Sequence, residues 1–307
     1  MDGAGRTTAA DNGGDLITAE LKTLLDTIEA SYWVPGVKTP VSGLQELGNA
    51  LQTSGSLLYA PVASFTTNIC AALQLLEFPY MALAPHVLRG TPIHDEARKP
   101  RGDDAAQQAL AVRFFTHALN ATDFHTKPEA MRLMHQALLL TWSALEIYCK
   151  EIFIYSLNAR PSLFSNIQRV QTLKQRFSIS QDRWLPLLEQ HGYNFNGCLG
   201  DILAGDRDFS SPQFLRELFG ALYKGEPAEN ETGAELLESF QEDAFWKLGQ
   251  RRHLIAHKCG VVDEEYIRKT DDPGQTVGQL LKLRGRDVGE AMSVATRCAM
   301  ALIIRAS

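Results

Sequence analysis

Cysteine is scarce in this chain and shows none of the spacings that form disulfide frameworks or zinc sites. The five cysteines are scattered, odd in number and contain no CxxC pair. A small disulfide-rich domain needs an even, closely spaced set, and a structural zinc site needs paired ligands. We therefore expect reduced thiols in a cytoplasmic protein that holds no metal. The cysteines are Cys70, Cys149, Cys198, Cys259 and Cys298.

Long hydrophobic runs and phosphate-binding glycine loops are missing as well. The stretch 57–76 comes nearest to a membrane span, but Pro61, Asn68 and Gln74 interrupt it. Residues 1–14 are small and polar, so we expect no signal peptide there. The glycine-rich residues 197–205 lack the spacing and strand context of a Walker or dinucleotide loop. The sequence thus predicts a protein outside the membrane and without a cofactor.

The balance of charge limits how the chain could meet nucleic acid. Its net charge of -6 argues against a protein that coats nucleic acid electrostatically. One segment is an exception, because residues 247–258 hold four fixed positive charges and no acid. A local basic site therefore remains compatible with the acidic total.

That basic segment belongs to the run FWKLGQRRHLIAHK at residues 245–258, which is the most informative part of the sequence. Arginine holds phosphate oxygens through two parallel hydrogen bonds and stays charged at any working pH. Histidine takes and returns a proton near neutral pH. Together they supply what cleavage of a phosphodiester by an internal hydroxyl requires, without a metal.

Helix geometry separates the members of this motif. Arg252 and His257 lie about 140° apart on an ideal helix, whereas His253 and His257, four residues apart, share a face. A long arginine side chain can reach around a helix. A second copy of the chain is the other way to complete a site.

Two further interpretations fit the same residues. Arg251, Arg252 and Lys258 can form a solvated basic helix end, favoured by the helix dipole and capped by Gly260. The two histidines also have the spacing of a helical metal pair, but Leu254 stands where the HExxH motif has its glutamate. No third metal ligand is evident in the sequence.

Hydrophobic periodicity predicts an almost entirely helical chain, hence an all-α fold. The sequence predicts three regions: a disordered N-terminus at 1–14, a helical region at 15–102, and a helical domain at 103–307 with a core of about 130–304. The second region ends in an irregular connector at 78–102. Short extended pieces are expected at 261–266 and 279–283, and a capping box of Asp287 and Glu290 is expected to open the last helix. The expected helices are 15–31, 44–52, 64–76, 103–119, 126–158, 160–176, 182–191, 212–223, 234–258 and 287–305.

The longest expected helix carries an acid among residues that ought to be buried. Glu146 follows closely on Trp142, and an acid on that face destabilises the fold unless it is paired. Either Glu146 is paired, or it lies solvated at the edge of the apolar face of this helix. In the second case Glu151 would be the acid that pairs with the motif. The predicted core stripe of this helix is Leu138, Leu139, Trp142, Leu145, Tyr148, Ile152 and Phe153.

The spacing Arg252-His253-x3-His257 resembles the signature of the HEPN family, many of whose members are ribonucleases. In that family an arginine is followed by Asn, Asp or His, then by three variable residues and a histidine. The chain looks similar to HEPN proteins from about Ala130 to Ile304, roughly half its length. Within this part only the Arg-His motif is specific.

The resemblance implies a HEPN-like helical bundle, with an N-terminal helical extension and a small β excursion after the motif helix. It also implies a metal-independent endoribonuclease. His257 would take the proton of a ribose 2′-hydroxyl, and Arg252, with Arg251, would stabilise the charge on the attacked phosphate. His257 of a second protomer, or His253, would protonate the leaving 5′-oxygen, giving 2′,3′-cyclic phosphate ends.

Supporting residues and partners follow from the same resemblance. HEPN domains often place an acid opposite the motif arginine, so Glu146 is expected to orient Arg251 or Arg252 or to hold a proton on His257. Lys258 adds positive charge. The expected partners are RNA, a second copy of the chain in a homodimer, and a regulatory or antitoxin-like protein. The implied setting is a toxin, phage defence or a stress response.

Two alternatives to an enzyme remain open. A non-catalytic HEPN-like module would dimerise, or would bind a nucleotide or a protein partner through the basic motif. The acidic net charge and the lack of a second basic, aromatic surface favour it. The other alternative is a helical scaffold in which the motif is a chance match.

Overall fold

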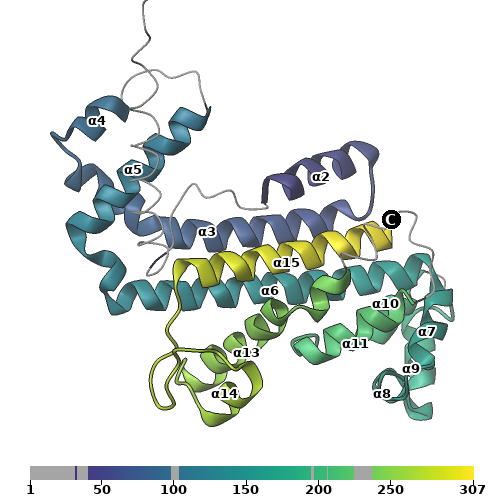
Figure 1. Cartoon of the computed structure of the whole chain (residues 1–307). Coiled ribbons are helices and arrows are strands. Elements are labelled where there is room, and N and C mark those ends of the chain that lie inside the picture. The colour runs from purple at the N-terminus through teal and green to yellow at the C-terminus, as the bar shows by residue number, and fades with distance from the viewer. Residues whose placement is uncertain (1–31, 33–40, 98–103, 195–196, 206, 225–236) are drawn as a thin grey trace, which may run out of the picture. The chain divides into compact units, whose positions relative to one another are not determined.

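The computed structural model of the chain describes residues 32, 41–97, 104–194, 197–205, 207–224 and 237–307 (Figure 1). These residues are mainly helical, and the β pairing among them is one isolated antiparallel bridge between Val261 and Leu280. The expected all-α class is thereby confirmed. The predicted disordered segment 1–14 and the predicted helix 15–31 lie outside the described residues. None of the described helices is long and apolar enough to cross a membrane.

Contacts between residues divide the chain into two units, each discontinuous in sequence. The described residues of the first unit come from Tyr32, Leu75–Met134 and Leu283–Val288. Those of the second unit come from Thr39–Gln74, His135–Lys282 and Gly289–Ser307. The division of the chain at residue 102 stays a prediction.

The first unit contains the C-terminal part of helix α3 and the helices that follow it. Its small apolar cluster joins Ala84, Leu88 and Ala118, with the partly buried Phe114 packed against them. The helices are α3 (Tyr59–Val87), α4 (Pro92–Ala97), α5 (Asp104–Thr122) and the 3-10 turn η1 (Phe124–Thr126).

Helix α3 corrects one expectation from the sequence. Residues 78–87 were predicted as part of an irregular connector because of their prolines, yet α3 continues through Pro79 and beyond. Leu76, Tyr80 and Ala84 recur every four residues, and each is buried. This periodic burial stabilises the helix more than a proline in the helix interior destabilises it.

The second unit holds the remaining helices, and helix α6 supplies much of its core. All members of the predicted stripe on α6 except Leu139 are buried. The Tyr148 hydroxyl donates to the Ala299 carbonyl at 3.0 Å, which ties α6 to α15 where the two helices run side by side (Figure 1). The helices are α2 (Val41–Ser54), the N-terminal part of α3, most of α6 (Pro128–Ala159), η2 (Pro161–Leu163), α7 (Phe164–Gln168), α8 (Gln171–Arg176), α9 (Gln181–Gln190), α10 (Leu199–Ala204), α11 (Pro212–Leu222), η3 (Glu238–Gln241), α13 (Asp243–Lys258), α14 (Glu264–Thr270) and most of α15 (Gly285–Ala306).

Two predicted helices are broken by extended residues. The predicted helix 160–176 is three short pieces, η2, α7 and α8, and the extended residue Val170 separates α7 from α8. The predicted helix 234–258 is interrupted at Glu242, which is also extended and separates η3 from α13. The Glu242 carboxylate accepts from the guanidinium of Arg297 on α15, so a tertiary contact holds this break in place.

Two local predictions near the motif were wrong. Residues 264–266, predicted as extended, begin helix α14, because the Asp263 carboxylate caps it by accepting from the Tyr266 amide at 2.7 Å. The last helix starts earlier than expected, at Gly285. Asp287 lies inside its first turn and accepts from the Arg284 amide at 2.8 Å, so it is not the capping residue of a box with Glu290.

Candidate functional site

Helix α13 carries the Arg-His motif and has two chemically distinct faces. Phe245, Leu248 and Leu254 are buried, and the Phe245 ring lies 5.7 Å from the Trp142 ring of α6. Trp246 and His253, seven residues apart, line an open cavity on another face. Packing of the apolar face against α6 therefore fixes the direction in which the polar side chains point.

The structure brings Arg252 and His257 together within one chain. Nη1 of Arg252 lies 3.5 Å from Nε2 of His257, although the two residues are five apart on α13. The arginine side chain is long enough to pass around the helix and meet the histidine. A second copy of the chain is therefore not needed to place these two groups side by side.

Glu146 of α6 reaches the same arginine. Its Oε2 lies 3.8 Å from Nη2 of Arg252, and the two side chains are 27% and 22% exposed. Burial raises the pKa of Glu146, while the charge of Arg252 acts in the opposite direction. Arg252 thus lies between a carboxylate and an imidazole, and both contacts limit the orientations of its guanidinium.

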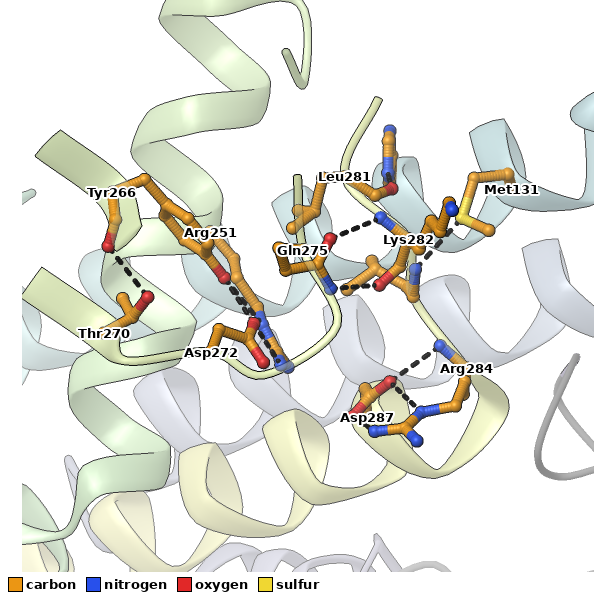
Figure 2. A network of polar contacts seen from close by, with 12 residues as sticks. Met131, Arg251, Tyr266, Thr270, Asp272, Gln275, Leu281, Lys282, Arg284 and Asp287 are labelled. Atoms are coloured by element: carbon orange, nitrogen blue, oxygen red, sulfur yellow. Dashed lines mark hydrogen bonds and ion pairs between the residues drawn. The ribbon is translucent and has the colours of Figure 1, made fainter. Parts of the chain in front are cut away.

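Arg251 occupies a different place from its neighbour. Its side chain is 6% exposed, and its Nη2 lies 3.0 Å from Oδ2 of Asp272. The Tyr266 hydroxyl donates to the same Asp272 oxygen at 2.6 Å (Figure 2). Arg251 was expected to support Arg252 or to lie on a solvated helix end. Instead it anchors α14 and the turn after it to α13, outside the cavity.

The charges of this buried network follow from its hydrogen bonds. Burial, and then the hydrogen bond to Asp272, raise the pKa of Tyr266 to about 12. Burial alone would raise the pKa of Asp272. The Tyr266 hydroxyl and the charge of Arg251 outweigh that effect and hold it below its ordinary value. Arg251 and Asp272 therefore form a charged pair at neutral pH.

The two histidines form a close pair on α13. Their ring centroids lie 4.8 Å apart, and both residues are exposed. Partial burial lowers the pKa of His253 although the residue reaches solvent, and nearby positive charges such as that of Lys269 lower it further. His253 therefore favours the neutral form at neutral pH, in which it accepts a proton.

Lys258 lies apart from this pair. Its ammonium donates to the Asp263 carboxylate, and this hydrogen bond raises the pKa of Lys258. It does not line the cavity. Its charge also contributes to the lowered pKa of His253. Lys258 thus supports the site only through its charge, and its contact with Asp263 links α13 to the start of α14.

The cavity beside the motif has a volume of about 370 Å³. Helix α13, the segment before α11, the first turn of α11 and Lys269 at the end of α14 surround it. Arg252, His253 and His257 all line it, so three of the predicted site residues meet there. The lining residues are Asp208, Ser210, Ser211, Pro212, Gln213, Trp246, Gly249, Gln250, Arg252, His253, His257 and Lys269.

Sequence reasoning missed Trp246, Lys269 and Asp208 as parts of this site. Trp246 could have been found, because it precedes His253 by seven residues and therefore shares a face of the same helix. Lys269 and Asp208 come from other elements, and nothing in their local sequence points to the motif. Only the tertiary fold brings them to it.

Asp208 adds one negative charge to the cavity wall. Burial alone would raise its pKa, but hydrogen bonds from Ser210 and the charges of Arg176 and Arg252 hold it below its ordinary value. Among the described residues there is no group of three His, Cys, Asp or Glu side chains arranged to hold a metal. The charged and ionisable side chains that line the cavity are an arginine, a lysine, two imidazoles and a carboxylate.

Gly249 allows the first turn of α11 to lie against α13. A Cβ at this position would lie 2.6 Å from Cγ of Pro212, which is closer than packed atoms approach. We expect Gly249→Ala to destabilise the fold by about 1–3 kcal/mol through overpacking, measured by urea denaturation. Gly220→Ala on α11 is the control, because a Cβ there meets nothing within 4 Å. A Gly249→Ala variant as stable as the parent would show that the α11–α13 contact adjusts freely.

Comparison of the chain with models of protein families, with curated proteins and with solved structures found no match. The function therefore has to be inferred from the chemistry of the cavity.

Proposed function

We propose that this protein is a metal-independent endoribonuclease of the HEPN type, which cleaves RNA at the cavity beside α13. The observation that carries the proposal is the contact of Arg252 with His257, whose Nη1 and Nε2 atoms lie 3.5 Å apart. Both residues line an open cavity that His253 lines as well. An arginine and two imidazoles are the groups needed to bind a phosphodiester and to move two protons around it.

The reaction needs one proton acceptor and one proton donor. In the proposed reaction His253 removes the proton from the ribose 2′-hydroxyl, and the 2′-oxygen attacks the adjacent phosphorus. As that bond forms, the bond from phosphorus to the 5′-oxygen breaks, and His257 gives the leaving oxygen a proton. The products are a 2′,3′-cyclic phosphate end and a 5′-hydroxyl end. Arg252 binds the non-bridging oxygens on which charge accumulates.

The lowered pKa of His253 supports this order of proton transfers. An imidazole with a lowered pKa is a better acceptor than donor at neutral pH. The motif by itself had suggested the opposite order, with His257 as the base. A guanidinium donates and does not accept, so His257 accepts from Arg252 in the contact between them. A bound phosphate would engage the arginine instead and so remove this contact from His257.

Trp246 bears on the kind of RNA that would be cut. Its indole nitrogen donates to the Lys269 carbonyl at 2.9 Å, and Cζ of Arg216 lies 5.4 Å from the ring centroid. An indole held in this way at a cavity wall offers a stacking surface to a base. Stacking requires an unpaired base, so we propose single-stranded RNA as the substrate.

The wider setting follows from the same proposal. HEPN-type ribonucleases act in toxin, phage-defence and stress systems, and a homodimer and a restraining protein partner belong to that setting. The homodimer stays a prediction, which light scattering of the purified protein would check.

A non-catalytic binding module is the second candidate. Two observations favour it: the net charge of -6, and the pairing of Arg252 with Glu146, which satisfies part of the arginine's charge. Such a module would bind RNA or a nucleotide in the cavity and leave it intact.

The test is an assay of RNA cleavage in the presence of EDTA. We expect single-stranded RNA to be cut, with 2′,3′-cyclic phosphate ends. DNA of the same sequence should stay intact because it lacks the attacking hydroxyl. Duplex RNA should be cut more slowly because its bases are not free to stack on Trp246. Activity that requires a divalent metal would rule out the proposed chemistry, and binding without cleavage would favour the module.

A further inference from the structure

A second cavity, of about 510 Å³, lies between α9, α10 and the residues that precede α9. Two arginines line it, Arg183 from α9 and Arg207 from the segment after α10. Ile179, Leu187 and Ile202 form apolar parts of the wall. Its size falls within the range of sites for small ligands, and it is distinct from the cavity beside α13.

Arg207 is held in one position by the backbone around it. Its Nε donates to the Arg176 carbonyl at 2.9 Å and its Nη1 to the Leu203 carbonyl at 2.6 Å. A longer bond, 3.4 Å, runs from Nη2 to the Ser178 carbonyl. A guanidinium has five N–H groups, so one on each terminal nitrogen is left for a ligand. Cζ also lies 5.3 Å from the ring centroid of Phe177.

Positive charge gathers around this cavity. Within the described part of the chain, neither Arg183 nor Arg207 forms an ion pair with a carboxylate. Burial lowers the pKa of Arg207, and the charges of Arg176 and Arg183 lower it further. Arg207 is partly buried and Arg183 is exposed, and cations that lie close together destabilise one another unless an anion joins them.

We propose that this cavity binds a small organic phosphate monoester. Its dianionic group would lie between Arg183 and Arg207, because two guanidinium groups match a dianion better than the single charge of a carboxylate. Its carbon body would cover the apolar wall that includes Ile179 and Leu187. The site does not depend on the proposed ribonuclease activity, because none of its lining residues lines the cavity beside α13.

Isothermal titration calorimetry of the full chain with butyl phosphate tests the site. We expect saturable binding, tighter than that of inorganic phosphate, because each methylene that becomes buried raises affinity about fourfold. Butanol should not bind, because it lacks the anion. Arg183→Gln should weaken binding about tenfold or more through the loss of a charge-assisted contact. Arg183 is the residue to change, because its side chain donates to no carbonyl among the described residues, whereas Arg207 donates to three.

The matched control is Arg169→Gln, which removes an exposed arginine at the end of α7 outside the cavity. It should bind butyl phosphate as tightly as the parent. No saturable binding of butyl phosphate at millimolar concentrations, or equal losses in the Arg183 and Arg169 variants, would overturn the proposal. The 5′-phosphate of an RNA is a second source of the same group. Comparing the binding of RNA oligomers with and without a 5′-phosphate distinguishes an RNA end from a small molecule as the source of the phosphate.

Discussion

Replacing His257 with alanine is expected to slow cleavage of ordinary RNA about 10²- to 10⁴-fold, the usual contribution of a positioned proton donor or acceptor. The loss should depend on the leaving group. A substrate with sulfur in place of the 5′-oxygen releases a thiolate, which needs no proton. His257→Ala should therefore cut that substrate at close to the parental rate. His253→Ala should remain slow on both substrates, because it lacks the acceptor for the 2′-hydroxyl proton.

The pH dependence of cleavage by the parent protein provides an independent check of these proposed roles. The pKa of His253 is lowered from 6.5 by burial and by the positive charges near it. His253 stays neutral, and able to accept a proton, down to a pH below 6.5. On the acid side, the rate should therefore fall as the pH drops through that lowered pKa.

Two outcomes would contradict the assignment. If His257→Ala slowed cleavage of the oxygen and the sulfur substrate equally, His257 would be the base and not the proton donor. An unchanged rate for this variant on ordinary RNA would exclude His257 from the chemistry. Circular dichroism of each variant serves as the control for folding, because both histidines are exposed on α13.

Replacing Asp272 with alanine is expected to destabilise the fold by about 3–5 kcal/mol, because it would remove the carboxylate from a buried, hydrogen-bonded charge pair with Arg251. The two side chains are 6% and 7% exposed and 3.0 Å apart. Tyr266 would lose its acceptor in the same step. Chemical denaturation of the purified variant measures the change in the free energy of unfolding.

Glu146→Ala is the matched control for a partly exposed pair. Its ion pair with Arg252 is longer, and both side chains reach solvent, so we expect a loss of less than about 1 kcal/mol. The double variant Arg251→Met with Asp272→Leu should recover part of the stability lost in Asp272→Ala, because it removes both buried charges. A loss of less than about 1 kcal/mol in Asp272→Ala would show that Arg251 finds another partner or solvent.

The regular spacing of apolar residues made much of the helical architecture predictable from the sequence. Trp142, Leu145 and Tyr148 belong to a stripe with helical spacing, and the structure buries them as the core of α6. The same local reasoning places the motif on a helix and puts His253 and His257 on one face of it. Helix periodicity depends on neighbours in the sequence, so it can be read without knowing the fold.

Helix ends and interruptions were less predictable, because tertiary contacts decide them. Burial of Tyr80 and Ala84 carries α3 through Pro79, against the local preference of proline. In the opposite sense, the extended Glu242 divides a predicted helix, and its pairing with Arg297 on α15 holds the break. Each outcome depends on a partner far away in the sequence.

The sequence by itself determined the all-α class and the local spacing of the arginines and histidines. Only the tertiary structure decided how the two adjacent arginines differ. Consecutive residues on a helix point about 100° apart. Arg251 therefore turns into the protein to meet Asp272, while Arg252 turns toward Glu146 and His257. The lowered pKa of His253 has a similar origin, since it arises from burial and from charges such as that of Lys269 on α14. These partners come from other helices, and no local pattern in the sequence reveals them.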